Sequence, residues 1–342
     1  MKRLMIAALS LATVVAGATA LRADPVEDFY RGKTMRMIIG YGVGGGYDLY
    51  GRIAAEFLSR HIPGKPTIVP QNMPGAGSFV AAKYMNEVAP KDGTVLASLA
   101  QTLATDTAAG SVVGLDATQF RYLGRITTNI EFGVALPKSG IKSFDDVRKR
   151  EVSTAVVGGA SIGVLLATAL NRYAGAKFKL VSGYKGSAET ILALERGEVD
   201  VVAATGLPST LVRKPGWIHK GEAAIIYQAA LKRHRLLPNT PALPELGQTD
   251  EGRAVLRVIA STAEIGRSIV TTPGVPPERV AALRKAFQAM LKDPAFIAAC
   301  EKRKMMFDPG TGEEMDQIVR DTVALPKALM AKFGELVRAP KK

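Results

Sequence analysis

The chain has 342 residues, of which 47% are hydrophobic, and a formal net charge of +14. This composition excludes a disordered protein, and the length is sufficient for two domains. The single cysteine, Cys300, excludes an internal disulfide, and we interpret it as a buried packing residue. Lysine and arginine are dispersed without interleaved aromatic residues, so we expect no nucleic-acid partner, although the positive charge favours small anions.

The first twenty residues have the features of an export signal. Lys2 and Arg3 precede a short apolar stretch, and an A-x-A cleavage site ends at Ala20. We therefore predict a signal peptide at 1–20, with Ala23 as the second choice of cleavage site. A large exported chain without disulfides is typical of the bacterial periplasm. Loss of the signal peptide leaves a formal charge of +12.

Two strand–loop–helix units begin the mature chain. The first combines an apolar strand at 35–39, a glycine-rich loop and a helix that starts at Asp48 and has apolar residues on one face. The second combines a strand at 67–69, the loop QNMPGAGS and a helix at 79–88. Strands that alternate with helices in this way predict an α/β fold with largely parallel sheets.

The first glycine-rich loop satisfies the dinucleotide-binding motif G-x-G-x-x-G with Gly40, Gly42 and Gly45. A dinucleotide fold also requires an acidic residue after its second strand, and none stands there in this chain. Two consecutive units instead direct two helix N-termini to one place, which predicts an anion site. We interpret Asp48 as the N-cap of the first helix, since a carboxylate aimed at that site would repel an anion.

The uncharged stretch at 152–171 has the length of a membrane span. Its β-branched first half and the Gly-Gly pair after it divide the stretch into a strand, a turn and a helix. Strands at 178–181 and 199–204 enclose one more helix, and the C-terminal part of the chain is more helical, with a helix predicted at 277–291. The alternation of strands and helices therefore continues through the second half.

The segments GYGVGGGYD and NMPGAGS together resemble the paired signature of substrate-binding proteins of the tripartite tricarboxylate transporter family, the Bug-type periplasmic receptors. Similar segments follow in family order, from about Lys33 to Val323: APKDGTVLAS, GYKGSAETILALERGEVDVV, LPNTPALPELG and TTPGVPPERVAALRKAF. The resemblance implies a type II periplasmic binding protein fold, with two α/β domains and a ligand cleft between them. It implies that domain I holds 24–126 and 226–342, and domain II 127–225.

A receptor of this kind captures a small organic carboxylate and delivers it to the membrane permease of a tripartite tricarboxylate-type transporter. We expect a monomer that is not an enzyme and has no cofactor. The three scattered histidines offer no metal-ligand spacing. The resemblance implies that the ligand carboxylate is bound by the two glycine loops, through Tyr41, Gly44, Gly45, Gly46, Tyr47, Pro74, Gly75, Ala76, Gly77 and Ser78.

Three hydroxyl residues are further candidates for ligand binding. Ser161 stands at the N-terminus of a predicted helix, and Thr102 and Thr205 each follow an apolar strand. For the two threonines, an ordinary loop hydroxyl is the alternative interpretation.

The loops also depart from the family pattern, which commonly has prolines at Gly40 and Gly42, a small hydroxyl residue at Tyr47 and a glycine at Ser78. We expect a more mobile first loop, and a tyrosine that narrows the pocket or stacks on a ring. The turn GGASIGVLL in the second domain has few polar side chains. We therefore hypothesise a ligand whose far end is less polar than citrate, an aromatic or aliphatic carboxylate, which calorimetry with citrate would contradict if citrate bound more tightly.

The same turn supports an alternative function, because it contains G-x-S-x-G around Ser161, between a strand and a helix. Asp200, followed by His219 or His234, completes the chain order of a serine hydrolase, which would make the protein an exported serine esterase. No HGGG-type segment precedes the serine, and Asp200 begins a strand instead of ending one. We therefore favour the receptor.

Overall fold

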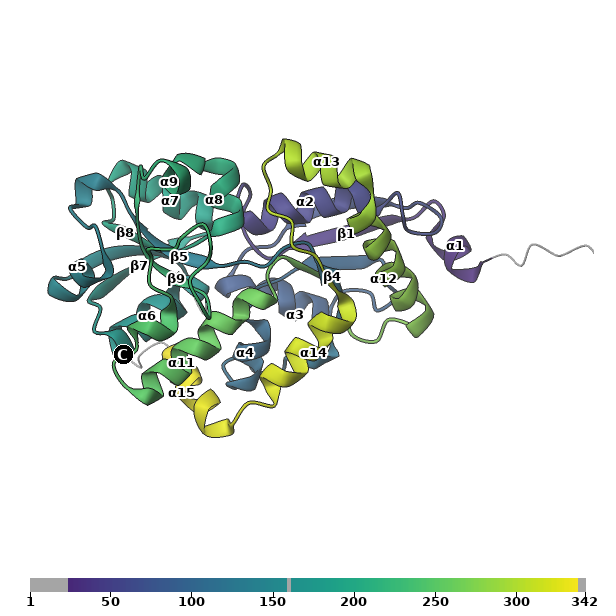
Figure 1. Cartoon of the computed structure of the whole chain (residues 1–342). Coiled ribbons are helices and arrows are strands. Elements are labelled where there is room, and N and C mark those ends of the chain that lie inside the picture. Colours follow the sequence, from purple (N-terminus) through teal and green to yellow (C-terminus); the bar gives the residue numbers. More distant parts are fainter. Residues whose placement is uncertain (1–23, 159–160, 338–342) are drawn as a thin grey trace, which may run out of the picture.

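The computed structural model describes residues 24–158 and 161–337, which form two lobes side by side, each built on one β-sheet (Figure 1). The predicted signal peptide at 1–20 and both of its candidate cleavage sites lie outside the described residues. The α/β class and the two-lobed architecture predicted from the sequence are confirmed.

The first lobe contains a sheet with the strand order β11-β4-β10-β3-β1-β2. β1 is parallel to β2 and β3, as the two strand–loop–helix units predict, whereas β10 and β11 pair antiparallel with their neighbours. The strands are β1 (Thr34–Ile39), β2 (Thr67–Asn72), β3 (Val95–Ser98), β4 (Arg121–Arg125), β10 (Ser268–Thr271) and β11 (Gly310–Thr311). The surrounding helices are α1 (Pro25–Tyr30), α2 (Gly46–Leu58), α3 (Phe79–Glu87), α4 (Leu103–Ala108), α12 (Pro277–Lys292), α13 (Pro294–Lys302) and α14 (Gly312–Val323).

The second lobe contains a sheet with the strand order β7-β6-β8-β5-β9. Its strands are β5 (Glu131–Ala135), β6 (Val152–Val157), β7 (Phe178–Tyr184), β8 (Val201–Gly206) and β9 (Ala224–Ala229). The remaining helices are α5 (Phe144–Lys149), α6 (Ile162–Ala174), α7 (Ser187–Arg196), α8 (Leu207–Arg213), α9 (Pro215–His219), α10 (Leu243–Leu246), α11 (Asp250–Ser261) and α15 (Lys327–Val337). The uncharged stretch at 152–171 is divided into β6 and α6, as predicted, and none of the described helices is long and apolar enough to cross a membrane.

The chain crosses from the first sheet to the second between β4 and β5, and it returns after β9. The domain boundary predicted at residue 226 falls inside β9, whose residues pair with β5 along the whole strand. After β9, α10 and α11 still pack on the second lobe, so the return crossing runs through residues 262–267, beside the first crossing at 126–129 and later than expected. Helices α11 and α15 lie in the C-terminal segment assigned to domain I, but they pack against α6 of the second lobe (Figure 1).

The buried faces of the helices follow the apolar periodicity of the sequence. In α12, Val280, Leu283, Phe287 and Met290 are all buried, and they form the predicted stripe at helical spacing. Cys300 is buried in the same core, which confirms its predicted packing role. Burial also raises the pKa of its thiol to about 11, so the thiol stays protonated and unreactive at neutral pH.

The first lobe contains one buried carboxyl group without a hydrogen-bond partner among the described residues, that of Asp106 on α4. Burial raises its pKa from 3.8 to about 8. Between these two values the unfolded chain releases this proton while the folded chain keeps it. The contribution of Asp106 to stability therefore falls as the pH rises from about 4 to about 8.

We expect Asp106→Asn to increase the free energy of unfolding at about pH 8 by at least about 2 kcal/mol, and to change it much less at about pH 5. Chemical unfolding at the two pH values measures the difference. The matched control is Asp28→Asn, since Asp28 is exposed on α1. An equal effect of Asp106→Asn at both pH values would contradict a protonated carboxyl group.

Candidate functional site

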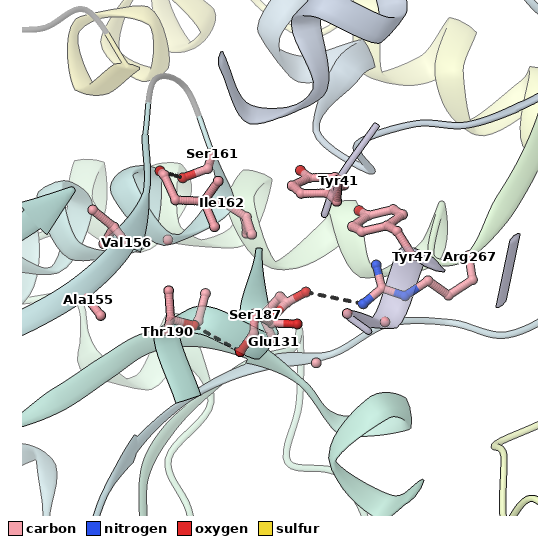
Figure 2. A pocket seen from close by; sticks show the side chains of 16 residues that line it. Tyr41, Tyr47, Glu131, Ala155, Val156, Ser161, Ile162, Ser187, Thr190 and Arg267 are labelled. Carbon is pink, nitrogen blue, oxygen red and sulfur yellow. Dashed lines mark hydrogen bonds and ion pairs between the residues drawn. The ribbon is translucent and has the colours of Figure 1, made fainter. Parts of the chain in front are cut away.

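A cavity lies between the two lobes (Figure 2). Its wall contains residues from the first glycine loop, from the crossing segments and from the second sheet. They are Tyr41, Gly45, Gly46, Tyr47, Glu131, Ala155, Val156, Val157, Ser161, Ile162, Gly163, Ser187, Thr190, Ala204, Gly206 and Arg267.

Helix α2 begins at Gly46, earlier than predicted, and Gly45, Gly46 and Tyr47 at its N-terminus line the cavity. Gly45 is its N-cap, and Asp48 occupies the third position of the helix, so the prediction of Asp48 as the N-cap was wrong. The carboxylate of Asp48 accepts a hydrogen bond from the backbone N–H of Gly44 and one from the side-chain amide of Asn72, both at 2.8 Å. It also binds Arg52 at 2.8 Å. Asp48 thus ties the first loop to the end of β2.

Two tyrosines stand between the cavity and the second glycine loop. The rings of Tyr41 and Tyr47 are stacked, with centroids 4.3 Å apart and an interplanar angle of 12°. The hydroxyl of Tyr41 donates to the carbonyl of Gly77 at 3.3 Å, and the hydroxyl of Tyr47 accepts from the backbone N–H of Gln101 at 3.0 Å. These aromatic side chains therefore fill the space in which the sequence predicted an anion between two loops.

Arg267 supplies a buried positive charge to the cavity wall. Its backbone pairs with the crossing segment, through hydrogen bonds with Thr127 and Ile126. The guanidinium carbon lies 3.9 Å from the centroid of the Tyr47 ring, which is a cation–π contact. Tyr41 stacks on the other face of the same ring. Gly46 and Gly206 make room for the guanidinium, since a Cβ atom at either position would lie within 2.9 Å or 2.7 Å, respectively, of Nη2.

The hydrogen-bonding capacity of this guanidinium is only partly used. Nη2 donates to Oδ1 of Asn129 at 2.8 Å. Nε and Nη1 are buried and have no hydrogen-bond partner in the described part of the chain. A buried arginine in a cavity wall is suited to bind a carboxylate, because it supplies a positive charge and N–H donors.

Glu131, the first residue of β5, lies beside Arg267 in the same wall. Its Oε1 is 3.6 Å from Nη2 of Arg267 and accepts a hydrogen bond from Asn129 at 2.5 Å. Asn129 also donates to Oε1 of Gln101 at 2.6 Å. Burial raises the pKa of Glu131, and the charge of Arg267 opposes that rise. Figure 2 shows the guanidinium directed at this carboxylate, below the ring of Tyr47.

The opposite wall comes from the second lobe and is largely hydrocarbon, with Val156 and Ile162 on the side away from Arg267 (Figure 2). Ser161 lines this wall as predicted, but its hydroxyl donates to the carbonyl of Val157. Ser187 and Thr190 add two more hydroxyl groups. The cavity therefore combines one charged end with a wall that is largely hydrocarbon and carries a few hydroxyl groups.

The structure brings only part of the predicted site to the cavity wall. Tyr41, Gly45, Gly46, Tyr47 and Ser161 line it. The predicted residues that do not line it are Gly44, Pro74, Gly75, Ala76, Gly77, Ser78, Thr102 and Thr205. The second loop is separated from the cavity by Tyr41, whereas the Thr205 hydroxyl is buried against that of Thr210 at 3.3 Å.

The sequence analysis missed Arg267 and Glu131. Arg267 directly precedes the short apolar strand SIVT, and Glu131 is the first residue of the short strand EFGVA. Both strands are fully buried. A charge at the edge of such a strand is expensive to bury unless it has a partner, and this was the signal available in the sequence.

The hydrolase arrangement does not assemble around Ser161. Asp200 directly precedes β8 and lies beside the start of β6, where its carboxylate accepts hydrogen bonds from the backbone and the hydroxyl of Ser153, both at 2.9 Å. Ser161 follows the other end of the same strand. His234 accepts from the backbone of Leu236. The described residues therefore do not support the esterase alternative, and they contain no group of three or more potential metal ligands of the His, Cys, Asp and Glu types.

The two lobes touch at the edge of the cavity. The backbone N–H of Gly42 in the first loop donates to the carbonyl of Lys185, which follows β7, at 3.1 Å. The neighbouring residues Gly45 and Ser187 both line the cavity. The first glycine loop thus bridges the lobes as well as forming part of the wall.

Two α/β lobes that are joined by crossing segments and enclose a cavity define a type II periplasmic binding protein. The family model described as "Tripartite tricarboxylate transporter family receptor" matches residues 51–335, which is most of the chain. The chain belongs to this family, and the resemblance seen in the glycine loops is confirmed.

Known proteins of similar sequence and structure agree with this assignment. A UPF0065 protein of Cupriavidus necator is 27% identical over 338 residues, covering 96% of each chain. The structure of the periplasmic binding protein BugD has a TM-score of 0.67 at 21% identity, covering 89% of this chain and 99% of BugD. MatC of Rhodopseudomonas palustris with bound malate has a TM-score of 0.68 at 17% identity, covering 90% and 99%. An R. palustris protein with adipate has a TM-score of 0.67 at 22% identity, covering 89% and 97%. These structures have the same fold.

Proposed function

We propose that the protein is a periplasmic receptor that captures a small organic carboxylate between its two lobes and delivers it to the permease of a tripartite tricarboxylate-type transporter. It acts as a monomer, and its predicted signal peptide at 1–20 directs export. Family membership supports the transport role. The similar structures that hold malate and adipate are consistent with a carboxylate ligand.

One observation in this chain carries the carboxylate assignment: two donor atoms of Arg267 have no partner among the described residues, and the side chain lines the cavity. Leaving such donors buried and unpaired costs about 1–3 kcal/mol for each group. A ligand carboxylate that accepts from the guanidinium supplies a partner for it and compensates its charge.

Thermal unfolding tests this function against a panel of mono-, di- and tricarboxylates, aromatic acids and amino acids. A ligand present at about 100 times its dissociation constant adds about 2.7 kcal/mol of stability, which raises the unfolding midpoint measurably. The uncharged amides of the same acids are the matched controls and should give no shift. If no acid shifts the midpoint, and mass spectrometry of the denatured protein finds no compound carried over from expression, the receptor function is wrong.

A further inference from the structure

The cavity wall pairs a buried cation with a buried anion, which is a stronger constraint on the ligand than a carboxylate site alone. Arg267 and Glu131 both line the cavity, and their side chains are almost fully buried. They come from different lobes, since Arg267 precedes β10 of the first sheet and Glu131 begins β5 of the second. When both groups are ionised, their charges cancel.

Glu131 also has an oxygen atom available for a ligand. The hydrogen bond from Asn129 and the approach of Arg267 both involve Oε1. Within 24–158 and 161–337, no donor is found on Oε2. Oε2 of Glu131 is therefore an unused acceptor, and Nε and Nη1 of Arg267 have no partner in the same part of the chain.

The net charge of the occupied cavity distinguishes plain carboxylates from zwitterions as ligands. When Glu131 is ionised beside Arg267, a simple monocarboxylate bound there leaves one buried negative charge without compensation, and a dicarboxylate adds a second one. Such uncompensated charges are costly in a buried site. A ligand with one carboxylate and one ammonium group satisfies both residues and leaves the site neutral. The remaining wall, which includes Val156 and Ile162, is apolar.

We propose that the ligand is a zwitterion, an amino acid with an apolar side chain, whose carboxylate binds Arg267 and whose ammonium group binds Glu131. Glu131 is then the residue that selects amino acids over the corresponding plain acids. This inference rests on the proposed carboxylate-binding function and narrows it to one class of substrate.

Pairs of compounds that differ only in the amino group test the proposal: L-valine against 3-methylbutanoate, and L-leucine against 4-methylpentanoate. Calorimetry on the protein purified from the full chain gives the affinity of each. We expect at least one amino acid to bind about tenfold or more tightly than its plain acid, which corresponds to one charge-assisted hydrogen bond.

Glu131→Gln should reverse this preference, because the amide still accepts from Asn129 but no longer compensates an ammonium charge. The variant leaves Arg267 without its partner charge, which lowers the unfolding midpoint, and it should bind the plain acid at least as tightly as the wild type does. The matched control is Glu278→Gln, since Glu278 is exposed on α12 and should leave the preference unchanged.

The outcomes separate this inference from the function on which it rests. If the wild type prefers the plain acid, or if Glu131→Gln still prefers the amino acid, the zwitterion is wrong while carboxylate binding stands. If neither member of any pair binds and no acid of the larger panel binds, both the inference and the proposed function fail.

Discussion

Removal of the buried charges, by Arg267→Met together with Glu131→Gln, is expected to lower the affinity for the best ligand of the panel at least about hundredfold. Two charge-assisted hydrogen bonds of about 1.5 kcal/mol or more each account for this loss. The double substitution avoids leaving Glu131 as an unpaired buried charge, which would destabilise the fold by itself. Isothermal titration calorimetry measures the affinity, and circular dichroism checks the fold.

An exposed arginine provides the control for this experiment. Arg257 lies on α11 with its side chain in solvent, and Arg257→Met removes the same charge without touching the cavity. It should leave the affinity within about twofold of the wild type. An affinity of the double variant within about threefold of the wild type would show that Arg267 does not bind the ligand.

Gly40→Ala is expected to lower the free energy of unfolding by about 2 kcal/mol or more, and Ser78→Gly should rescue most of this loss. A Cβ atom at position 40 would lie 2.0 Å from Oγ and 2.7 Å from Cβ of Ser78, closer than real atoms approach. Ser78 has a φ of +85°, a conformation that glycine adopts at no steric cost. The double variant therefore removes the clash and relaxes the second loop.

A double-mutant cycle in chemical unfolding measures this coupling, which should be at least about 1 kcal/mol. The control is Gly163→Ala, where a Cβ atom in α6 would meet its nearest neighbour at 3.5 Å, an ordinary contact. Additive effects of Gly40→Ala and Ser78→Gly would refute the coupling. The same contact explains two departures from the family pattern, Gly40 in place of proline and Ser78 in place of glycine. A side chain at position 40 and one at position 78 would occupy the same space.

The fold was predictable because the apolar periodicity and the glycine loops are local properties of the sequence. The strand at 152–157 and the helix after it were predicted from a change of period across a Gly-Gly pair, and β6 and α6 lie there. The return crossing was placed too early because β9, α10 and α11 stay with the second lobe through contacts with distant segments, and no local pattern marks where those contacts end.

The candidate site was predictable only where the backbone determines which residues line the cavity. The first loop reaches the cavity because helix α2 fixes its position, as the sequence indicates. The second loop does not reach it, because the outcome depends on the side-chain conformations of Tyr41 and Tyr47, which stack on each other. Arg267 and Glu131 meet through the crossing of two distant segments, and a single sequence does not reveal that pairing.

The backbone hydrogen bond between Gly42 and Lys185, at 3.1 Å, has a kinetic consequence. A ligand enclosed by the two lobes leaves only after they separate, and separation breaks this bond whichever compound is inside. Lobe opening therefore sets a common upper limit on the dissociation rates of all enclosed ligands. Ligands whose release is limited by lobe opening have the same residence time even when their affinities differ widely. That residence time measures the opening rate of the protein and not the strength of ligand binding.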